Sequence, residues 1–210
     1  MKRLNQKIKT NKGMTILELI VVFGIFSVLS GVTVFNYGSF QGKVDIKNLA
    51  NDIALKIVEA QKGALFGKFP PPPQDSFVTS VWKPSYGVYF DLIGVGNRGF
   101  IYFTDINPVN NLYDGTSACT NECIEKTTIT KGNTISELRV FYKSPVSNAS
   151  FNDLTMSFTR PDSKAVMAST SAFTGGVSNI DYIQITIASP KTPPATATIK
   201  LYPSGRVQIN

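Results

Sequence analysis

The chain of 210 residues contains no histidine and only two cysteines. The absence of histidine excludes Ser-His-Asp triads, histidine general bases and histidine metal ligands. Two thiols, Cys119 and Cys123, are too few for a structural zinc site, which takes four ligands. Since no pair of carboxylates stands out along the chain either, we predict that the protein is not an enzyme and needs no resident cofactor.

The two cysteines lie close together in the segment Cys119-Thr120-Asn121-Glu122-Cys123. A disulfide is expected if this part of the chain lies outside the cytoplasm, and a free reduced pair is the alternative. Because the closed loop is short, such a disulfide would hold a local turn and add only modestly to global stability.

Basic residues become scarce after the first thirteen positions. The chain has 21 Lys and Arg against 14 Asp and Glu, a net charge of +7, but five of the basic residues are Lys2, Arg3, Lys7, Lys9 and Lys12. Without residues 1–13, 16 basic side chains face 14 acidic ones, a net charge of +2. Most of the net positive charge therefore belongs to the leader, where it is expected to hold that segment in the cytoplasm. A nucleic-acid partner is not expected for the rest of the chain.

Positive charge is absent from the apolar run Ile16–Phe35, whose one acidic residue is Glu18. About 20 apolar residues suffice for a helix to cross the ~30 Å hydrocarbon core of a membrane. A secretory signal peptide has a shorter apolar region of ~7–15 residues followed by a small-residue cleavage site, and no Ala-x-Ala pattern follows Phe35. A plain anchor fits the length but leaves Glu18 unexplained, because a carboxylate in mid-membrane costs roughly 2.5–3.5 kcal/mol.

The segment around Gly13, with Met14, Thr15 and Glu18 leading into the apolar run, resembles the class III signal of type IV pilins and type II secretion pseudopilins. The resemblance implies that a prepilin peptidase cuts the leader (residues 1–13) after Gly13 and that Met14 becomes a methylated N-terminus. Glu18 would then be fifth in the mature chain, where the family's carboxylate pairs with the terminal amine of a neighbouring subunit during assembly.

The same resemblance implies a role, partners and a location. The chain would be a structural filament subunit, of the minor pilin or pseudopilin branch, to which Tyr86–Phe90 and Ile199–Val207 are similar. Its partners would be other pilin subunits, the prepilin peptidase and methyltransferase, an inner-membrane assembly platform and membrane lipid. It would span the inner membrane once with the C-terminal domain outside the cytoplasm, then enter an extracellular or periplasmic filament. The alternatives are a pilus-borne adhesin, a DNA-uptake binding subunit or a membrane-tethered enzyme.

Five segments are expected along the chain: the leader (1–13), an apolar membrane and filament-core helix (14–36), an amphipathic helix (37–68), a Pro-rich linker (69–75) and a β-rich globular domain (76–210). The amphipathic helix has an apolar stripe at three- and four-residue steps, formed by Ile46, Leu49, Ala50, Ile53, Ile57, Ala60 and Ala64. The stripe needs a sheet to cover it, so the predicted fold is α+β, a long N-terminal helix packed on an antiparallel sheet. Pro70–Pro73 favour an extended polyproline II spacer.

The β signals begin after Gln74 and rest on β-branched and aromatic residues with period-two alternation. The predicted strands are Phe77–Trp82, Tyr86–Phe90, Phe100–Thr104, Thr134–Tyr142, Thr155–Thr159, Ile180–Ala188, Thr196–Tyr202 and Arg206–Ile209. The segment from Tyr202 to Arg206 is predicted to turn between the last two strands. Four rings among these signals, Trp82, Tyr86, Tyr89 and Tyr102, are interpreted as core residues, with a stacking platform for single-stranded DNA as the alternative.

A polar stretch from Asp105 to Asp114 carries the one metal hypothesis. Asp105, Asn107 and Asp114 supply oxygen ligands of the kind that calcium prefers, but Val109 stands where a third alternating ligand would be. A plain turn is the other interpretation, because Asp and Asn side chains hydrogen-bond the local backbone.

Overall fold

The structure is a computed structural model that describes residues 13–80, 82–106, 110–116, 118–162, 164–190 and 193–210, and at Asn36 and Ser39 the backbone alone. The described residues form one long helix, α1 (Ile16–Leu65), and then an all-β region. Two compact units divide the chain, residues 1–41 and residues 42–210, and each is treated by itself.

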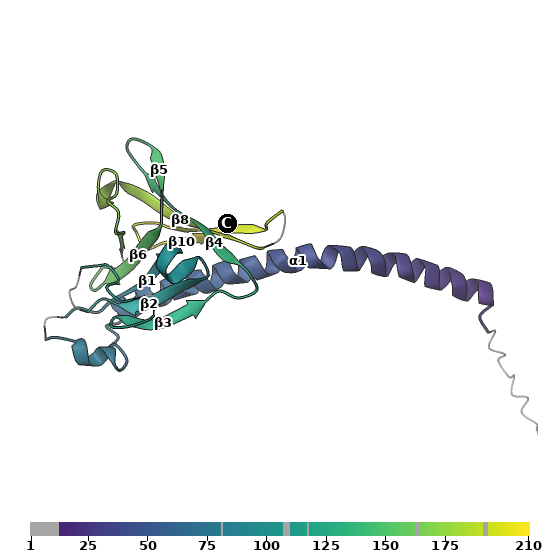
Figure 1. The fold of residues 1–210 in the computed structure, drawn as a ribbon, viewed down its shortest axis with the longest axis horizontal. Coiled ribbons are helices and arrows are strands. Elements are labelled where there is room, and N and C mark those ends of the chain that lie inside the picture. Colours follow the sequence, from purple (N-terminus) through teal and green to yellow (C-terminus); the bar gives the residue numbers. More distant parts are fainter. Residues whose placement is uncertain (1–12, 81, 107–109, 117, 163, 191–192) are drawn as a thin grey trace, which may run out of the picture. The chain divides into compact units, whose positions relative to one another are not determined.

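Ten strands are found in the described part of the second unit (Figure 1). They are β1 (Ser85–Asp91), β2 (Gly99–Thr104), β3 (Cys123–Thr128), β4 (Thr134–Tyr142), β5 (Ser147–Phe151), β6 (Asp153–Thr159), β7 (Ala165–Ala168), β8 (Ile180–Ala188), β9 (Thr196–Leu201) and β10 (Val207–Ile209). Short helical turns occur at η1 (Gln74–Phe77), η2 (Leu92–Gly96) and η3 (Val177–Asn179).

The strands form two antiparallel sheets of five strands each. Sheet 1 has the order β3-β2-β1-β6-β7, and sheet 2 has the order β10-β9-β8-β4-β5. Sequence-distant strands meet at the centre of both sheets, where β1 pairs with β6 and β4 pairs with β8. The predicted turn closes β9 onto β10 with a hydrogen bond from Tyr202 N to Arg206 O of 3.0 Å.

The apolar stripe of the amphipathic segment is buried against both sheets. Its members other than Leu49 are 0–1% exposed, and they share one core cluster with residues of sheet 1 and sheet 2. Leu49 is partly buried against the same cluster. This confirms the α+β fold, a long helix whose second half packs on an antiparallel sheet domain.

Ion pairs also connect this part of α1 to the sheet domain. Lys56 Nζ lies 2.8 Å from a carboxylate oxygen of Glu125 on β3 and 3.0 Å from one of Glu59. Burial lowers the pKa of Lys56, but its hydrogen bonds to these carboxylates outweigh that and hold the pKa above its ordinary value. A second pair joins Lys131 to Asp45 at 2.7 Å.

Two predictions about the segment after the helix were wrong. Phe77–Trp82 does not form a strand; Phe77 ends η1, and no strand is present in the described residues before Ser85. The four prolines do not run on as an extended spacer either, since Pro73 has helical angles (φ −86°, ψ −1°) and precedes η1 directly. An apolar run alone therefore indicated a strand in a segment that the structure gives to a short helical turn and loop.

Candidate functional site

The first turn of α1 is built around Thr15. The backbone N–H of Glu18 donates to Thr15 Oγ1 at 3.3 Å, and the N–H of Leu19 donates to the Thr15 carbonyl at 3.1 Å. Thr15 with Glu18 three residues on has the spacing of a capping box, in which a hydroxyl satisfies an otherwise unpaired amide of the first turn. Sequence analysis missed this role, although the Thr-x-x-Glu spacing could have indicated it.

Glu18 is solvent-exposed and stands among exposed apolar side chains. Its carboxylate also lies in the first turn, where negative charge is favoured by the helix dipole. Within residues 13–41 the acidic group therefore has a local structural role and an outward-facing position.

Among the described residues, no contact requires a glycine at position 13. A Cβ placed on Gly13 would meet no atom within 4 Å, and the neighbouring Met14 is exposed. The same is true of Gly24 and Gly31, although each lies inside a helix, where glycine costs ~1 kcal/mol relative to alanine. Three glycines thus lack an explanation inside the single chain.

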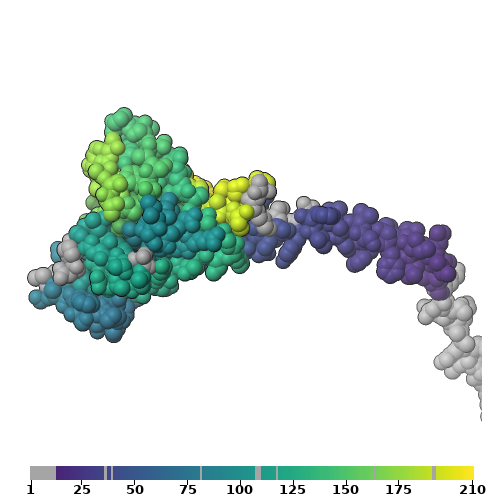
Figure 2. Space-filling model, in the orientation of Figure 1, coloured from purple at the N-terminus to yellow at the C-terminus, as the bar shows by residue number. Residues whose placement is uncertain are grey.

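The large hydrophobic side chains of the apolar run are exposed, and Figure 2 shows this part of the chain as the purple surface. The exposed large hydrophobic residues run from Met14 to Phe40 and include Phe35, which is 89% exposed. By length and composition, α1 contains a segment able to cross a membrane. A water-soluble domain would not leave so large an apolar surface uncovered.

Further along the same helix, the side turned away from the sheets carries an apolar groove of about 580 Å³. Leu55, Val58 and Phe66 line it, and Glu59 and Lys62 lie at its margin. Leu55 and Phe66 are largely exposed, which leaves this groove uncovered in the single chain.

The loop after β2 covers the outer face of sheet 1 and contains the disulfide. Cys119 and Cys123 are bonded, which confirms the expected pairing. Cys123 belongs to a small second core with Ile101, Phe103 and Tyr113, against which Cys119 packs. The disulfide therefore holds a loop that buries the second face of β2.

A buried carboxylate, Glu122, organises this loop. Its two oxygens accept the backbone N–H groups of Ile106 at 2.9 Å and Asp114 at 3.0 Å, and its side chain is almost fully buried. Sequence analysis missed Glu122, because nothing in its local pattern distinguishes it from a solvated acid. Next to it lies a cavity of about 250 Å³, lined by Phe77, Ile106, Asp114, Asn121 and Glu122.

Of the three residues predicted as calcium ligands, Asn107 lies outside the described residues. Asp105 Oδ2 accepts the N–H of Asn111 at 2.7 Å, and Asp114 Oδ2 accepts from the amide of Asn110 at 2.9 Å. Both carboxylates thus make turn contacts, and the described residues contain no group of three or more His, Cys, Asp or Glu side chains placed to hold a metal ion.

Asp105 is nonetheless unusual, because it is fully buried and its Oδ1 has no hydrogen-bond partner. Burial raises its pKa to about 7, and the nearby Glu122 and Asp114 carboxylates act in the same direction against the lowering effect of the Asn111 N–H.

The predicted aromatic cluster separates into distinct roles. Tyr86 and Tyr102 are buried and stack on each other with ring centroids 6.0 Å apart. Tyr89 packs on Tyr113 at 5.0 Å, while Trp82 Nε1 donates to the Asp105 carbonyl at 2.9 Å. Burial raises the pKa of Tyr86 to about 12. These rings stabilise the domain and do not form an exposed stacking platform.

The fold also brings together two carboxylates that sequence analysis did not connect. Asp91 on β1 is the register partner of Asp153 on β6, beside a cavity of about 280 Å³. Asp91 accepts the N–H groups of Ile93 and Val95, and Asp153 accepts the N–H and hydroxyl of Thr170. Each carboxylate therefore holds its own loop.

Comparison of the chain with protein-family models, with curated proteins and with solved structures found no match.

Proposed function

We propose that this chain is a structural subunit of a type IV pilus-like or type II secretion filament, anchored by its apolar helix before assembly. The observation that carries the proposal is the run from Ile16 to Phe35, a helix exposed on every side with a single carboxylate in its first turn. Such a surface needs an apolar environment, which a membrane supplies first and a bundle of equivalent helices supplies later.

The glycines support the same assignment. A Cβ at Gly13 would meet none of the described residues, and a protease that needs an unobstructed backbone at the cut would account for a glycine there. Gly24 and Gly31 carry a helix penalty without a contact in the single chain, and small residues let neighbouring helices approach closely. The groove beside Leu55 gives a neighbouring subunit a second apolar surface in the sheet-bearing unit.

Glu18 has a direct part in the proposed assembly. A carboxylate transferred into an apolar bundle requires a cationic partner, and the amine of Met14 in a neighbouring subunit would supply one. In the membrane stage, the five basic residues of the leader would keep it on the cytoplasmic side and place the sheet domain on the other side.

The first test is the intact mass and N-terminal sequence of the protein recovered from membranes after co-expression with a prepilin peptidase. A start at Met14 with one added methyl group is the expected result. An uncut start at Met1 would indicate a plain anchored domain, and a cut after the apolar run would indicate a secreted protein; either result would overturn the proposal.

The second test replaces Glu18 with Gln. Cleavage after Gly13 should continue, because the cut lies outside the helix, whereas incorporation into filaments should fall because the amide cannot neutralise an ammonium group. Asp52→Asn is the matched control, since it makes the same chemical change at an exposed helix position in the second unit. Normal incorporation of Glu18→Gln would refute the assigned pairing.

A further inference from the structure

The outer face of sheet 2, turned away from the core, carries three aromatic rings in a row. Phe141 on β4 stacks on Tyr182 on β8 with centroids 4.5 Å apart and planes 18° apart. Tyr202, directly after β9, lies 5.6 Å from Tyr182. The three rings are half-buried, so they project from an otherwise polar face in restricted positions.

Two cations rest on these rings. Lys200 Nζ lies 4.7 Å from the centroid of Tyr182, and the guanidinium carbon of Arg206 lies 3.9 Å from the centroid of Tyr202. Ring faces attract cations through their quadrupole and restrict where these long side chains point. The positive charges are thereby positioned without being neutralised.

Some other basic side chains of the second unit make ion pairs where these two do not. Lys56, Lys131 and Arg139 each make an ion pair with an acidic side chain. Within the part of the chain that the structure describes, no such pair is found at Lys200 or Arg206. The register neighbours of Lys200 are Gln184 and Gln208, two neutral amides, so neither neighbouring strand places an opposite charge directly across from it.

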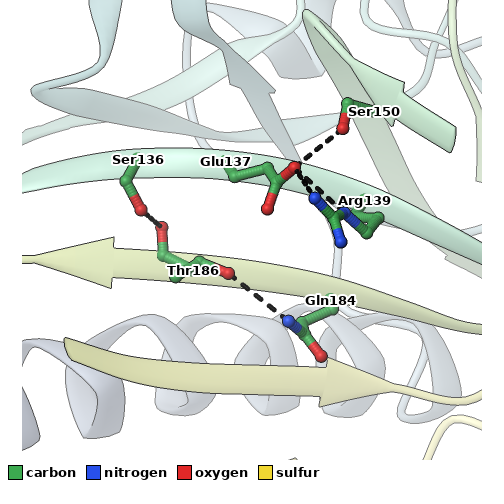
Figure 3. A network of polar contacts seen from close by, with 6 residues as sticks. All are labelled: Ser136, Glu137, Arg139, Ser150, Gln184 and Thr186. Atoms are coloured by element: carbon green, nitrogen blue, oxygen red, sulfur yellow. Dashed lines mark hydrogen bonds and ion pairs between the residues drawn. The ribbon is translucent and has the colours of Figure 1, made fainter.

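Next to these cations the face carries one ion pair and several hydrogen-bonding groups, as Figure 3 shows for β4 and β8. Glu137 binds Arg139 and accepts from Ser150 Oγ at 2.7 Å, so the charge of Arg139 is compensated locally. Gln184 and Thr186 lie beside it on β8, with the Gln184 amide 3.5 Å from the Thr186 hydroxyl. The face thus combines two unpaired cations with many amide and hydroxyl groups.

We propose that this face binds an acidic polysaccharide, a polymer with carboxylate groups set among many hydroxyls. The carboxylates would be held by Lys200 and Arg206, and the hydroxyls by the amides of Gln184 and Gln208. Single-stranded nucleic acid fits less well, because base stacking needs open ring faces and Phe141 and Lys200 already occupy those of Tyr182. Duplex DNA, with one charge per ~1.7 Å, calls for many more cations than two.

The experiment measures binding of the detergent-solubilised full-length chain to immobilised polygalacturonate, with dextran as the neutral polymer and single-stranded oligothymidylate as the nucleic-acid probe. The wild-type chain should bind polygalacturonate in a salt-sensitive manner and not bind dextran. The double variant Lys200→Gln/Arg206→Gln should bind roughly tenfold more weakly, as expected for losing two exposed charge contacts of about 0.7 kcal/mol each.

The matched control is Lys83→Gln, which removes one positive charge from the exposed segment before β1 and should leave binding unchanged. Lys200→Arg keeps the charge and should retain binding. Failure of the wild-type chain to bind polygalacturonate, equal binding by the double variant, or tighter binding to oligothymidylate would each overturn the proposal. Because the uncut chain is used, these results do not depend on processing at Gly13 or on filament assembly.

Discussion

Gly87, in the middle of β1, shows how closely a single position is constrained. A Cβ at this residue would lie 2.5 Å from Phe103 Cε1 and 2.6 Å from the Met156 carbonyl oxygen. The position is sandwiched between a ring of the small second core and the backbone of β6. Glycine is therefore needed here because of close approach, since its backbone angles are ordinary for a strand.

We predict that Gly87→Ala destabilises the domain by about 1–3 kcal/mol, the usual cost of overpacking a filled core. Gly63→Ala is the control, because its Cβ would touch Tyr86 and Tyr102 at an ordinary 3.4 Å and the change improves helix propensity. Denaturant unfolding followed by circular dichroism measures both. Equal stability of the two variants would contradict the constraint at Gly87.

At the scale of a single residue, the buried Asp105 should also make the stability of the domain depend on pH. Its pKa is about 7 in the folded chain against an ordinary 3.8, so between these pH values the folded state binds more protons than the unfolded state. Stability from this group is therefore full below pH ~4, declines as the pH rises to ~7, and changes little above it.

Asp105→Asn should remove that decline, because the neutral amide still offers an oxygen to the Asn111 N–H. The measurement is the melting temperature of both proteins from pH 4 to pH 8. Glu122 and Asp114 remain in the variant, so a decline that persists unchanged in Asp105→Asn would contradict the assignment of the pH effect to Asp105.

Among the elements, helix α1 was the part best predicted from the sequence. Its apolar stripe repeats at helical spacing, and repetition within one segment is local information that a sequence displays directly. The strands with clean alternation, such as Ile183–Ile187 within β8, were predicted for the same reason. β3, β5 and β7 were missed, since they are short or largely polar and owe their state to pairing with distant neighbours.

The candidate sites divide in the same way. Cys119 and Cys123 are the chain's two cysteines, and their bond was predicted on the condition that this part of the chain lies outside the cytoplasm. The contacts of Glu122 depend on which strands become neighbours. The pairing of Asp91 with Asp153 depends on the same register, which a single sequence does not display. The division of the strands between two sheets was likewise not predicted from local patterns.

Within α1, Gly24 and Gly31 supply a prediction about assembly. Replacing both with Leu should leave folding of the single chain intact or improve it, because a Cβ at either position meets open space. In a filament the added bulk would keep neighbouring helices apart, so incorporation should fall. Leu29→Ile, a change of shape without added volume in the same run, is the control, and filament yield by electron microscopy is the measurement.

At the scale of the whole molecule, the core and the apolar run occupy different units. Each residue of the main core cluster lies at or beyond Ile46, inside residues 42–210. The first unit contributes exposed apolar surface and no member of this core. The sheet domain should therefore not depend on the first unit for its stability.

A chain that begins at Gly42 is predicted to be soluble without detergent, monomeric, and close in melting temperature to the full-length protein. Gel filtration and thermal denaturation check this. A shorter chain that begins at Ser85, which lacks the helical stripe as well, should fail to fold because the core between the sheets would be open. Aggregation of the Gly42 chain would contradict the independence of the sheet domain from the first unit.

The hydroxyl of Thr15 determines where helix α1 begins. Helix initiation is the costly step of helix formation, and a cap lowers that cost at the place where the first turn begins. Here the cap belongs to the residue after Met14, so a cut behind Gly13 would leave α1 with its starting point intact. Loss of the residues before Met14 would therefore leave the cap of the first helical turn in place.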